Sequence, residues 1–138
     1  MRSSSTPCPR VNQYFEEFPN HELSGGDGHL HWSVQDYGYR PVTAVTHTLV
    51  YEPSEVPRGQ PEVLIAQKHL FTTHYFEARI EFSGLFADES DATCLVYVDR
   101  SLFDDKVSGV KRKMLVRGVL EDVAKRTNAH RDHMTVKR

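Results

Sequence analysis

Five of the eight histidines lie in or beside strand-like segments, and they are the first candidates for chemistry. His29 and His31 alternate along one predicted strand, so their imidazoles share a face at a spacing of about 7 Å. A zinc site needs further ligands, and no HExxH, CxxC or calcium-loop pattern accompanies this pair. The sequence therefore predicts neither a metal site nor a cofactor, and a surface pair is the favoured interpretation.

His47 and His74 stand in apolar alternations, which predicts that both imidazoles point into the interior. A buried neutral imidazole needs one donor and one acceptor partner, and nearby threonines can supply them. This structural interpretation competes with a catalytic one, in which His47 or His74 acts as a general base at the mouth of a cavity. Asp99 would then orient a histidine, whereas its structural alternative is a salt bridge or the capping of a turn.

The segment HYFEARIEFSGLF, residues 74–86, alternates between apolar and polar side chains, as a strand with one face on a core does. Its even-numbered residues are expected to face inward, and Tyr75, Arg79 and Glu81 to face water. A pocket behind the inward rings would then open at the polar head of the strand. The predicted ligand-binding residues are His69, Tyr75, Phe76, Ile80, Phe82 and Tyr97.

The segment KRKMLVR, residues 111–117, places cations in the first turns of a predicted helix. The helix dipole disfavours a cation there by about 0.3–1 kcal/mol. Asp104, Asp105 or acidic strand residues could compensate, or an anionic partner could: a phosphate-bearing ligand, a membrane surface or RNA. No aromatic interleaving or glycine-rich loop accompanies the run, so nucleic acid is not expected. The predicted anion- or partner-binding residues are Lys111, Arg112, Lys113 and Arg117.

Hydrophobic periodicity predicts the elements that position these residues. A short helix is expected over residues 11–18, followed by strands at 29–37, 41–51, 63–71, 74–86 and 93–98. A long helix is expected over residues 108–127, with a stripe formed by Val116, Val119, Leu120, Val123 and Thr127. We expect one domain over residues 11–127, a disordered tail at 1–10 and a flexible tail at 128–138.

Four to five antiparallel strands followed by a long amphipathic helix indicate an α+β fold. This element order resembles START-like, polyketide-cyclase-type proteins, which implies a curved antiparallel sheet with the C-terminal helix packed on it (a helix-grip layout). A cone-shaped, scytalone-dehydratase-like α+β fold is the alternative.

The runs THYF (residues 73–76) and LVYVDRS (residues 95–101), with the basic helix, also resemble a family of uncharacterised bacterial proteins. The resemblance covers roughly residues 11–126. It carries no activity and no catalytic residues to this chain. Members of that family have more sequence in front, which implies that this chain is shortened at its N-terminus.

Composition limits the functional classes. The chain has 138 residues, 38% of them hydrophobic, and a net charge of −2, which is ordinary for a soluble globular protein. Residues 106–126 are strongly basic, with seven basic and two acidic side chains. No apolar run approaches the roughly 20 residues that span a bilayer, and no signal peptide is visible, so a cytoplasmic location is expected.

Three functions agree with these observations. The favoured one is a binding domain whose apolar pocket, between sheet and helix, takes a small hydrophobic or acyl-chain-like ligand. The second is a cyclase- or dehydratase-like enzyme with a pocket histidine as base. The third is an interaction module that docks on an acidic or lipid partner through its basic helix. The sequence leaves the ligand and the oligomeric state open.

Overall fold

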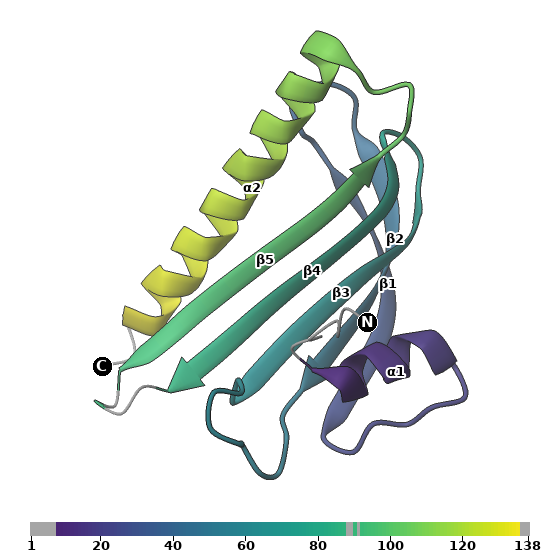
Figure 1. The fold of residues 1–138 in the computed structure, drawn as a ribbon. Helices are drawn as coiled ribbons and strands as arrows, with labels where there is room; N and C mark the ends of the chain where they lie inside the picture. Colours follow the sequence, from purple (N-terminus) through teal and green to yellow (C-terminus); the bar gives the residue numbers. More distant parts are fainter. Residues whose placement is uncertain (1–7, 88–89, 91, 136–138) are drawn as a thin grey trace, which may run out of the picture. The chain divides into compact units, whose positions relative to one another are not determined.

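The computed structural model describes residues 8–87, 90 and 92–135. Two helices flank five strands along the chain (Figure 1). The elements are α1 (Pro9–Glu17), β1 (Gly26–Gln35), β2 (Val42–Tyr51), β3 (Val63–Thr72), β4 (Phe76–Ala87), β5 (Thr93–Phe103) and α2 (Gly109–Thr135). Residues 1–7 and 136–138 of the two predicted tails lie outside the described residues. The rest of those tails is largely helical, because α1 begins at Pro9 and α2 ends at Thr135.

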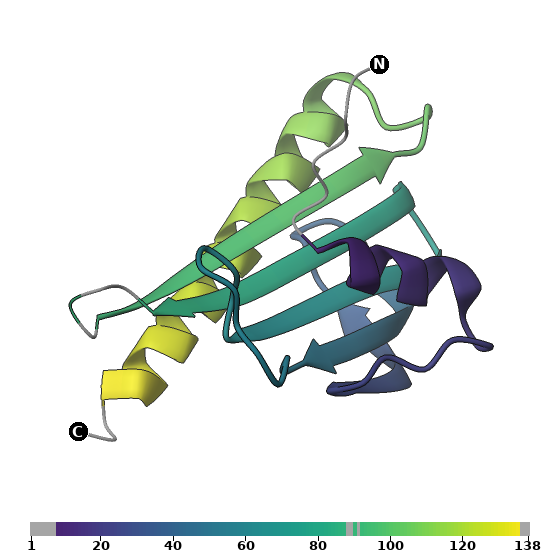
Figure 2. The ribbon, with the colours of Figure 1, turned by 60° about the horizontal axis from the view of Figure 1, so that its bottom comes forward.

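The strands form one sheet in the order β1-β2-β3-β4-β5, so each strand pairs with its neighbour in sequence (Figure 2). Such pairing suits antiparallel strands, which short turns can join. In the β3–β4 pair, Val63 stands opposite Leu85 and Lys68 opposite Ile80. The predicted α+β fold, a five-stranded antiparallel sheet with a long C-terminal helix, is confirmed. In the described part of the chain, neither helix combines the length and hydrophobicity needed to cross a membrane.

The chain divides into two compact units, each assembled from three segments. Unit 1 takes its described residues from Met1–Leu30, His47–Lys68 and Ile80–Asp99. Unit 2 takes them from His31–Thr46, His69–Arg79 and Arg100–Arg138. Each unit has its own cluster of buried apolar side chains.

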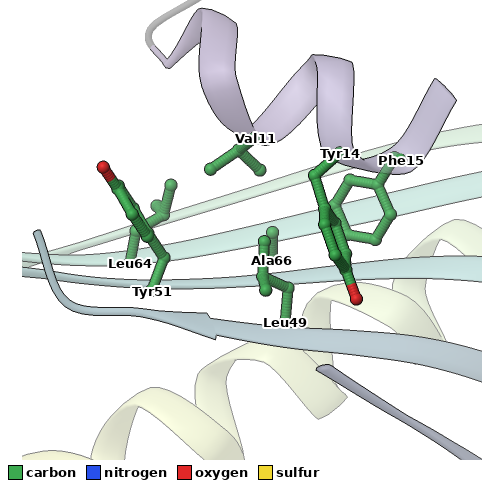
Figure 3. Packing of buried hydrophobic residues seen from close by; sticks show 7 residues of the cluster. All are labelled: Val11, Tyr14, Phe15, Leu49, Tyr51, Leu64 and Ala66. Carbon is green, nitrogen blue, oxygen red and sulfur yellow. The ribbon is translucent and has the colours of Figure 1, made fainter. Parts of the chain in front are cut away.

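The core of unit 1 lies between α1 and strands β2 and β3. Val11, Tyr14 and Phe15 are spaced as i, i+3 and i+4, so they occupy one face of α1 and are buried. Figure 3 shows these side chains beside those of the strands. The strand side chains of this core are Leu49, Tyr51, Leu64 and Ala66. Phe82 of β4 packs against the same core and is partly buried.

The core of unit 2 contains the inner face of α2, which includes Val119 and Val123 of the predicted stripe but not Val116 and Leu120. Leu115 and Val119 are buried, whereas Val116 is 38% and Leu120 63% exposed. The cause lies at Gly118, where a Cβ atom would come within 2.2 Å of the Tyr37 carbonyl oxygen. Only glycine allows this approach, so the helix turns Leu115 and Val119 inward. They pack in a cluster with Tyr37, Val42, Tyr75, Phe76 and Val107.

The predicted alternation of β4 is wrong between Phe76 and Glu81, whereas Phe82 packs on a core and Gly84 is buried as predicted. Glu77 and Ala78 are both exposed, and Arg79 and Glu81 are only 2% exposed. The repeat of buried positions is thus shifted by one residue, as an extra residue in a β-bulge does. The shift places the Arg79 guanidinium 5.6 Å from the centre of the Phe76 ring. Arg79 donates hydrogen bonds to the Tyr37 hydroxyl and Gln35, and Glu81 accepts one from the Tyr97 hydroxyl, which is how these buried polar groups are compensated.

Candidate functional site

A tight turn joins β3 to β4 in unit 2. It contains Tyr75, the one residue other than glycine that has a positive φ among the described residues. The Phe76 N–H donates to the His74 carbonyl at 2.9 Å, and Tyr75 between them has φ +70°. This combination is the positive-φ γ-turn, a rare and strained conformation. Thr72 helps to hold the turn, because its hydroxyl donates to the Phe76 carbonyl at 2.8 Å. The turn presents His74 and Tyr75 in fixed positions.

A second turn, after β5, lies against the first. The Asp104 N–H donates to the Tyr75 carbonyl at 2.8 Å, and the Val107 N–H donates to the Asp104 carbonyl at the same distance. The Asp104 carboxylate accepts the Lys106 N–H at 2.9 Å, an arrangement that aspartate favours in turns. The chain then enters α2, whose first turn contains no acidic residue. The start of a basic helix is thereby held beside Tyr75.

A cavity of about 350 Å³ lies where these turns meet the segment that follows β1. All of its lining belongs to unit 2. The lining residues are Tyr39, Arg40, Thr73, His74, Tyr75, Asp104, Lys106, Val107 and Lys111. We refer to this cavity as the Tyr75 pocket.

The Tyr75 pocket is positively charged. Arg40, Lys106 and Lys111 contribute cations against the single carboxylate of Asp104, and His74 adds a further charge when it is protonated. The Lys111 ammonium lies 5.0 Å from the centre of the Tyr75 ring and 5.7 Å from that of Tyr39. These distances are within the range of cation–π attraction, which holds the ammonium at the pocket.

Tyr75 is buried at this site, with 7% of its surface exposed. Its hydroxyl is fully covered and has no hydrogen bond of good geometry from the described residues. Burial raises the pKa of Tyr75, while the nearby charge and backbone of Arg40 lower it by a smaller amount. The phenol is therefore neutral at physiological pH, and its O–H is an unused donor beside a cationic cavity.

The structure brings three sequence-predicted residues together here: Lys111, Tyr75 and His74. The other predicted cations lie elsewhere on α2. Arg112 lies 5.8 Å from the centre of the Phe103 ring, and Lys113 is exposed. Arg117 is exposed and pairs with Glu121 at 2.9 Å.

The other predicted ligand-binding residues are distributed over both units. Phe76 is buried in the core of unit 2, where its ring meets those of Tyr37 and Phe103, and His69 lies in β3 of the same unit. Phe82 packs against the core of unit 1, and Ile80 and Tyr97 belong to the same unit. An apolar pocket behind Phe76, Ile80 and Phe82 stays a prediction.

His47 is buried in unit 1, with 1% of its surface exposed. Its Nε2 atom and the Tyr14 hydroxyl are hydrogen-bonded at 3.0 Å, and the rings of Phe15 and Phe18 pack around it. Burial lowers the pKa of His47, and the charges of Lys68 and His29 lower it further. The hydrogen-bond partner of the buried imidazole is therefore Tyr14, whereas the sequence predicted a nearby threonine. Asp99 is half-buried within β5, which continues to Phe103 instead of ending before Asp99.

Sequence reasoning missed Tyr39, Arg40 and Lys106 as site residues. Tyr39 and Arg40 follow Gly38, whose φ of +81° turns the chain after β1. The run DYGYR, residues 36–40, combines turn-forming residues with an aromatic ring and a cation. That run is the local signal that could have marked the segment, although its partners are about 35 and 70 residues away along the chain.

Comparison with known proteins finds no matching family model, no similar curated protein and no similar solved structure. Among the described residues, no group of three or more histidine, cysteine or acidic side chains is placed to hold a metal ion.

Proposed function

We propose that this chain is a binding module for a small anionic ligand, which it takes in the Tyr75 pocket. The sequence predicted anion or partner binding by several cations of the basic helix. The proposal assigns anion binding to Lys111 in its first turn. The pocket volume of about 350 Å³ lies within the range of about 300–1,000 Å³ that is typical of small-molecule sites.

One observation carries the proposal: cations from separate segments converge on a cavity that is also lined by Tyr75, whose buried O–H has no acceptor among the described residues. A buried hydrogen-bond donor without an acceptor destabilises a protein by about 1–3 kcal/mol. The Tyr75 O–H is such a donor, although the Arg40 backbone interacts with its oxygen, and Tyr75 itself adopts a strained backbone conformation. An anion would accept its hydrogen bond and neutralise the surrounding charge.

The structural alternative is that Asp104 alone balances the cations. Asp104 supplies one negative charge for three positive ones, and one of its oxygens already accepts the Lys106 N–H. Lys111 also lies in the first turn of α2, where the dipole disfavours it. The excess positive charge favours an external anion as the balancing group.

The test is an NMR titration of the ¹⁵N-labelled chain with pyrophosphate, with sodium chloride at matched ionic strength as reference. We expect saturable shifts of the amides of Tyr39, Tyr75, Lys106 and Lys111, because these residues line the pocket. Shifts that merely follow ionic strength, equally with both salts, would refute the proposal.

Two variants make this test specific. Lys111→Met removes the ammonium but keeps an unbranched side chain over the tyrosine rings, so we expect binding to weaken at least about fivefold. Lys125→Met is the matched control, because Lys125 is an exposed cation of α2 that does not line the pocket. Equal weakening in both variants would indicate a diffuse charge effect and would exclude a defined site.

A further inference from the structure

We infer, on the basis of the proposed anion-binding function, that the Tyr75 pocket takes a dianionic phosphomonoester and not a carboxylate. Its charge is the first reason. Arg40, Lys106 and Lys111 against Asp104 leave a net charge of about +2 when His74 is neutral. A phosphomonoester carries about −1.5 to −2 at pH 7, which matches this excess.

The donors of the pocket are the second reason. A guanidinium offers five N–H groups, each ammonium offers three, and the Tyr75 hydroxyl offers one more. A carboxylate has only two oxygens to accept them, whereas a phosphomonoester has three terminal oxygens. Three oxygens allow Arg40, Lys106 and Lys111 each to bind an oxygen of its own.

The start of α2 is the third reason. The first backbone N–H groups of a helix have no partner within the helix, and the dipole favours negative charge there. No acidic side chain occupies the first turn of α2, and Lys111 of that turn lines the pocket. Tyr75, whose buried O–H has no acceptor among the described residues, lines the same pocket from a different segment.

The experiment compares three small anions by NMR titration at a pH of about 7.5: methyl phosphate, dimethyl phosphate and succinate. Methyl phosphate is a phosphomonoester and is mainly dianionic at that pH, because its second pKa is about 6. Dimethyl phosphate has lost one charge and one terminal oxygen, and succinate has the same charge as methyl phosphate on carboxylates. We expect methyl phosphate to bind at least about tenfold more tightly than either of the others.

The outcomes separate this inference from the proposed function. Succinate binding as tightly as methyl phosphate would overturn the ligand class and leave anion binding intact. Failure of all three anions and of pyrophosphate to shift the pocket amides would overturn both.

Tyr75→Phe tests the role of the hydroxyl, because it keeps the ring under Lys111 and removes only the O–H. We expect methyl phosphate to bind about five- to tenfold more weakly, with succinate affected less. Arg40→Lys keeps the charge but loses the planar fork of the guanidinium, so it should also weaken methyl phosphate binding. Unchanged methyl phosphate affinity in both variants would contradict the inference.

A phosphomonoester can be a free metabolite or a lipid headgroup, and two further probes distinguish these sources. Glycerol 3-phosphate tests the soluble source, and phosphatidylcholine vesicles with and without phosphatidic acid test the membrane source. Binding to either probe that depends on Tyr75 supports the phosphomonoester class and identifies its source. Binding to neither probe would overturn the inference even if pyrophosphate still binds.

Discussion

At the scale of single residues, two buried side chains of unit 1, Tyr14 and His47, meet at one hydrogen bond. His47 and Tyr14 are both buried, and each has its pKa shifted toward the neutral form by burial. Gly28 lies beside them, because a Cβ atom there would come within 2.0 Å of the Tyr14 hydroxyl oxygen. The packing of α1 against β1 and β2 therefore depends on the His47 imidazole, the Tyr14 phenol and the absence of a side chain at Gly28.

Protonation of His47 should destabilise the fold. Because its pKa is lowered in the folded state, the unfolded chain takes up the proton more readily. The stabilising contribution is thus complete above the unfolded pKa of about 6.5 and is lost as the pH falls below it. The charges of Lys68 and His29 also lower the pKa of His47. The charge of Asp27 raises the pKa of Tyr14, which lies beside His47. The free energy of unfolding, measured with urea between a pH of about 7.5 and 5.5, should decrease.

His47→Gln is the comparison for this measurement, because glutamine does not titrate. In this variant the free energy of unfolding should decrease less between those pH values. The remaining decrease comes from the other titrating groups. An identical pH dependence in both proteins would contradict the role assigned to His47.

Gly28→Ala should destabilise the chain by about 1–3 kcal/mol, because the added methyl group overlaps the Tyr14 hydroxyl. In the Tyr14→Phe background the same substitution should be milder, since the overlapping oxygen is gone. A double-mutant cycle from urea unfolding measures this coupling. If the two substitutions were additive, the cost of a side chain at position 28 would not arise from contact with the Tyr14 hydroxyl.

At the scale of elements, the order of helices and strands was predictable, whereas the buried faces of α2 and β4 were predictable only in part. The alternation of β2 and the periodicity of α2 are local properties, so the sequence predicted both elements. The inner face of α2 depends instead on contact between Gly118 and the Tyr37 carbonyl, which are far apart in sequence. The shift in β4 between Phe76 and Arg79 likewise has no local signal, because Glu77 and Arg79 read as an ordinary solvent-facing pair.

The corrected face of α2 gives a matched pair of substitutions. Leu115→Ala should destabilise the chain by about 2–5 kcal/mol, because Leu115 has no exposed surface and its removal leaves a cavity. Leu120→Ala should change the free energy of unfolding by less than about 1 kcal/mol, since Leu120 is 63% exposed. Urea unfolding measures both, and the reverse order would restore the originally predicted stripe.

At the scale of the whole molecule, charge is distributed very unevenly. The chain has a net charge of −2, yet residues 106–126 contain seven basic and two acidic side chains. The Tyr75 pocket lies where this basic segment begins, so part of the site could be predicted from sequence through Lys111. Arg40 and Tyr39 could not, because a pocket assembled from three distant segments leaves no spacing pattern in any one of them.

A ligand that binds only the folded chain must stabilise it. At a pyrophosphate concentration of about 100 times its dissociation constant, the free energy of unfolding should increase by about 2.7 kcal/mol. Urea unfolding with and without pyrophosphate measures the increase, and sodium chloride at equal ionic strength is the control. Lys111→Met should reduce the increase, and an equal increase in this variant would place the anion outside the pocket.

The absent side chain at Gly118 also sets the position of α2 along its own axis. Sliding the helix by one residue, or rotating it by the 100° that separates neighbours, would bring Arg117 or Val119 against the Tyr37 carbonyl. Neither side chain fits in that space, so a single alignment of helix and loop is sterically allowed. Lys111 lies two turns earlier on the same helix. Its contact with the rings of Tyr39 and Tyr75 therefore depends on the close approach of Gly118 to the Tyr37 carbonyl.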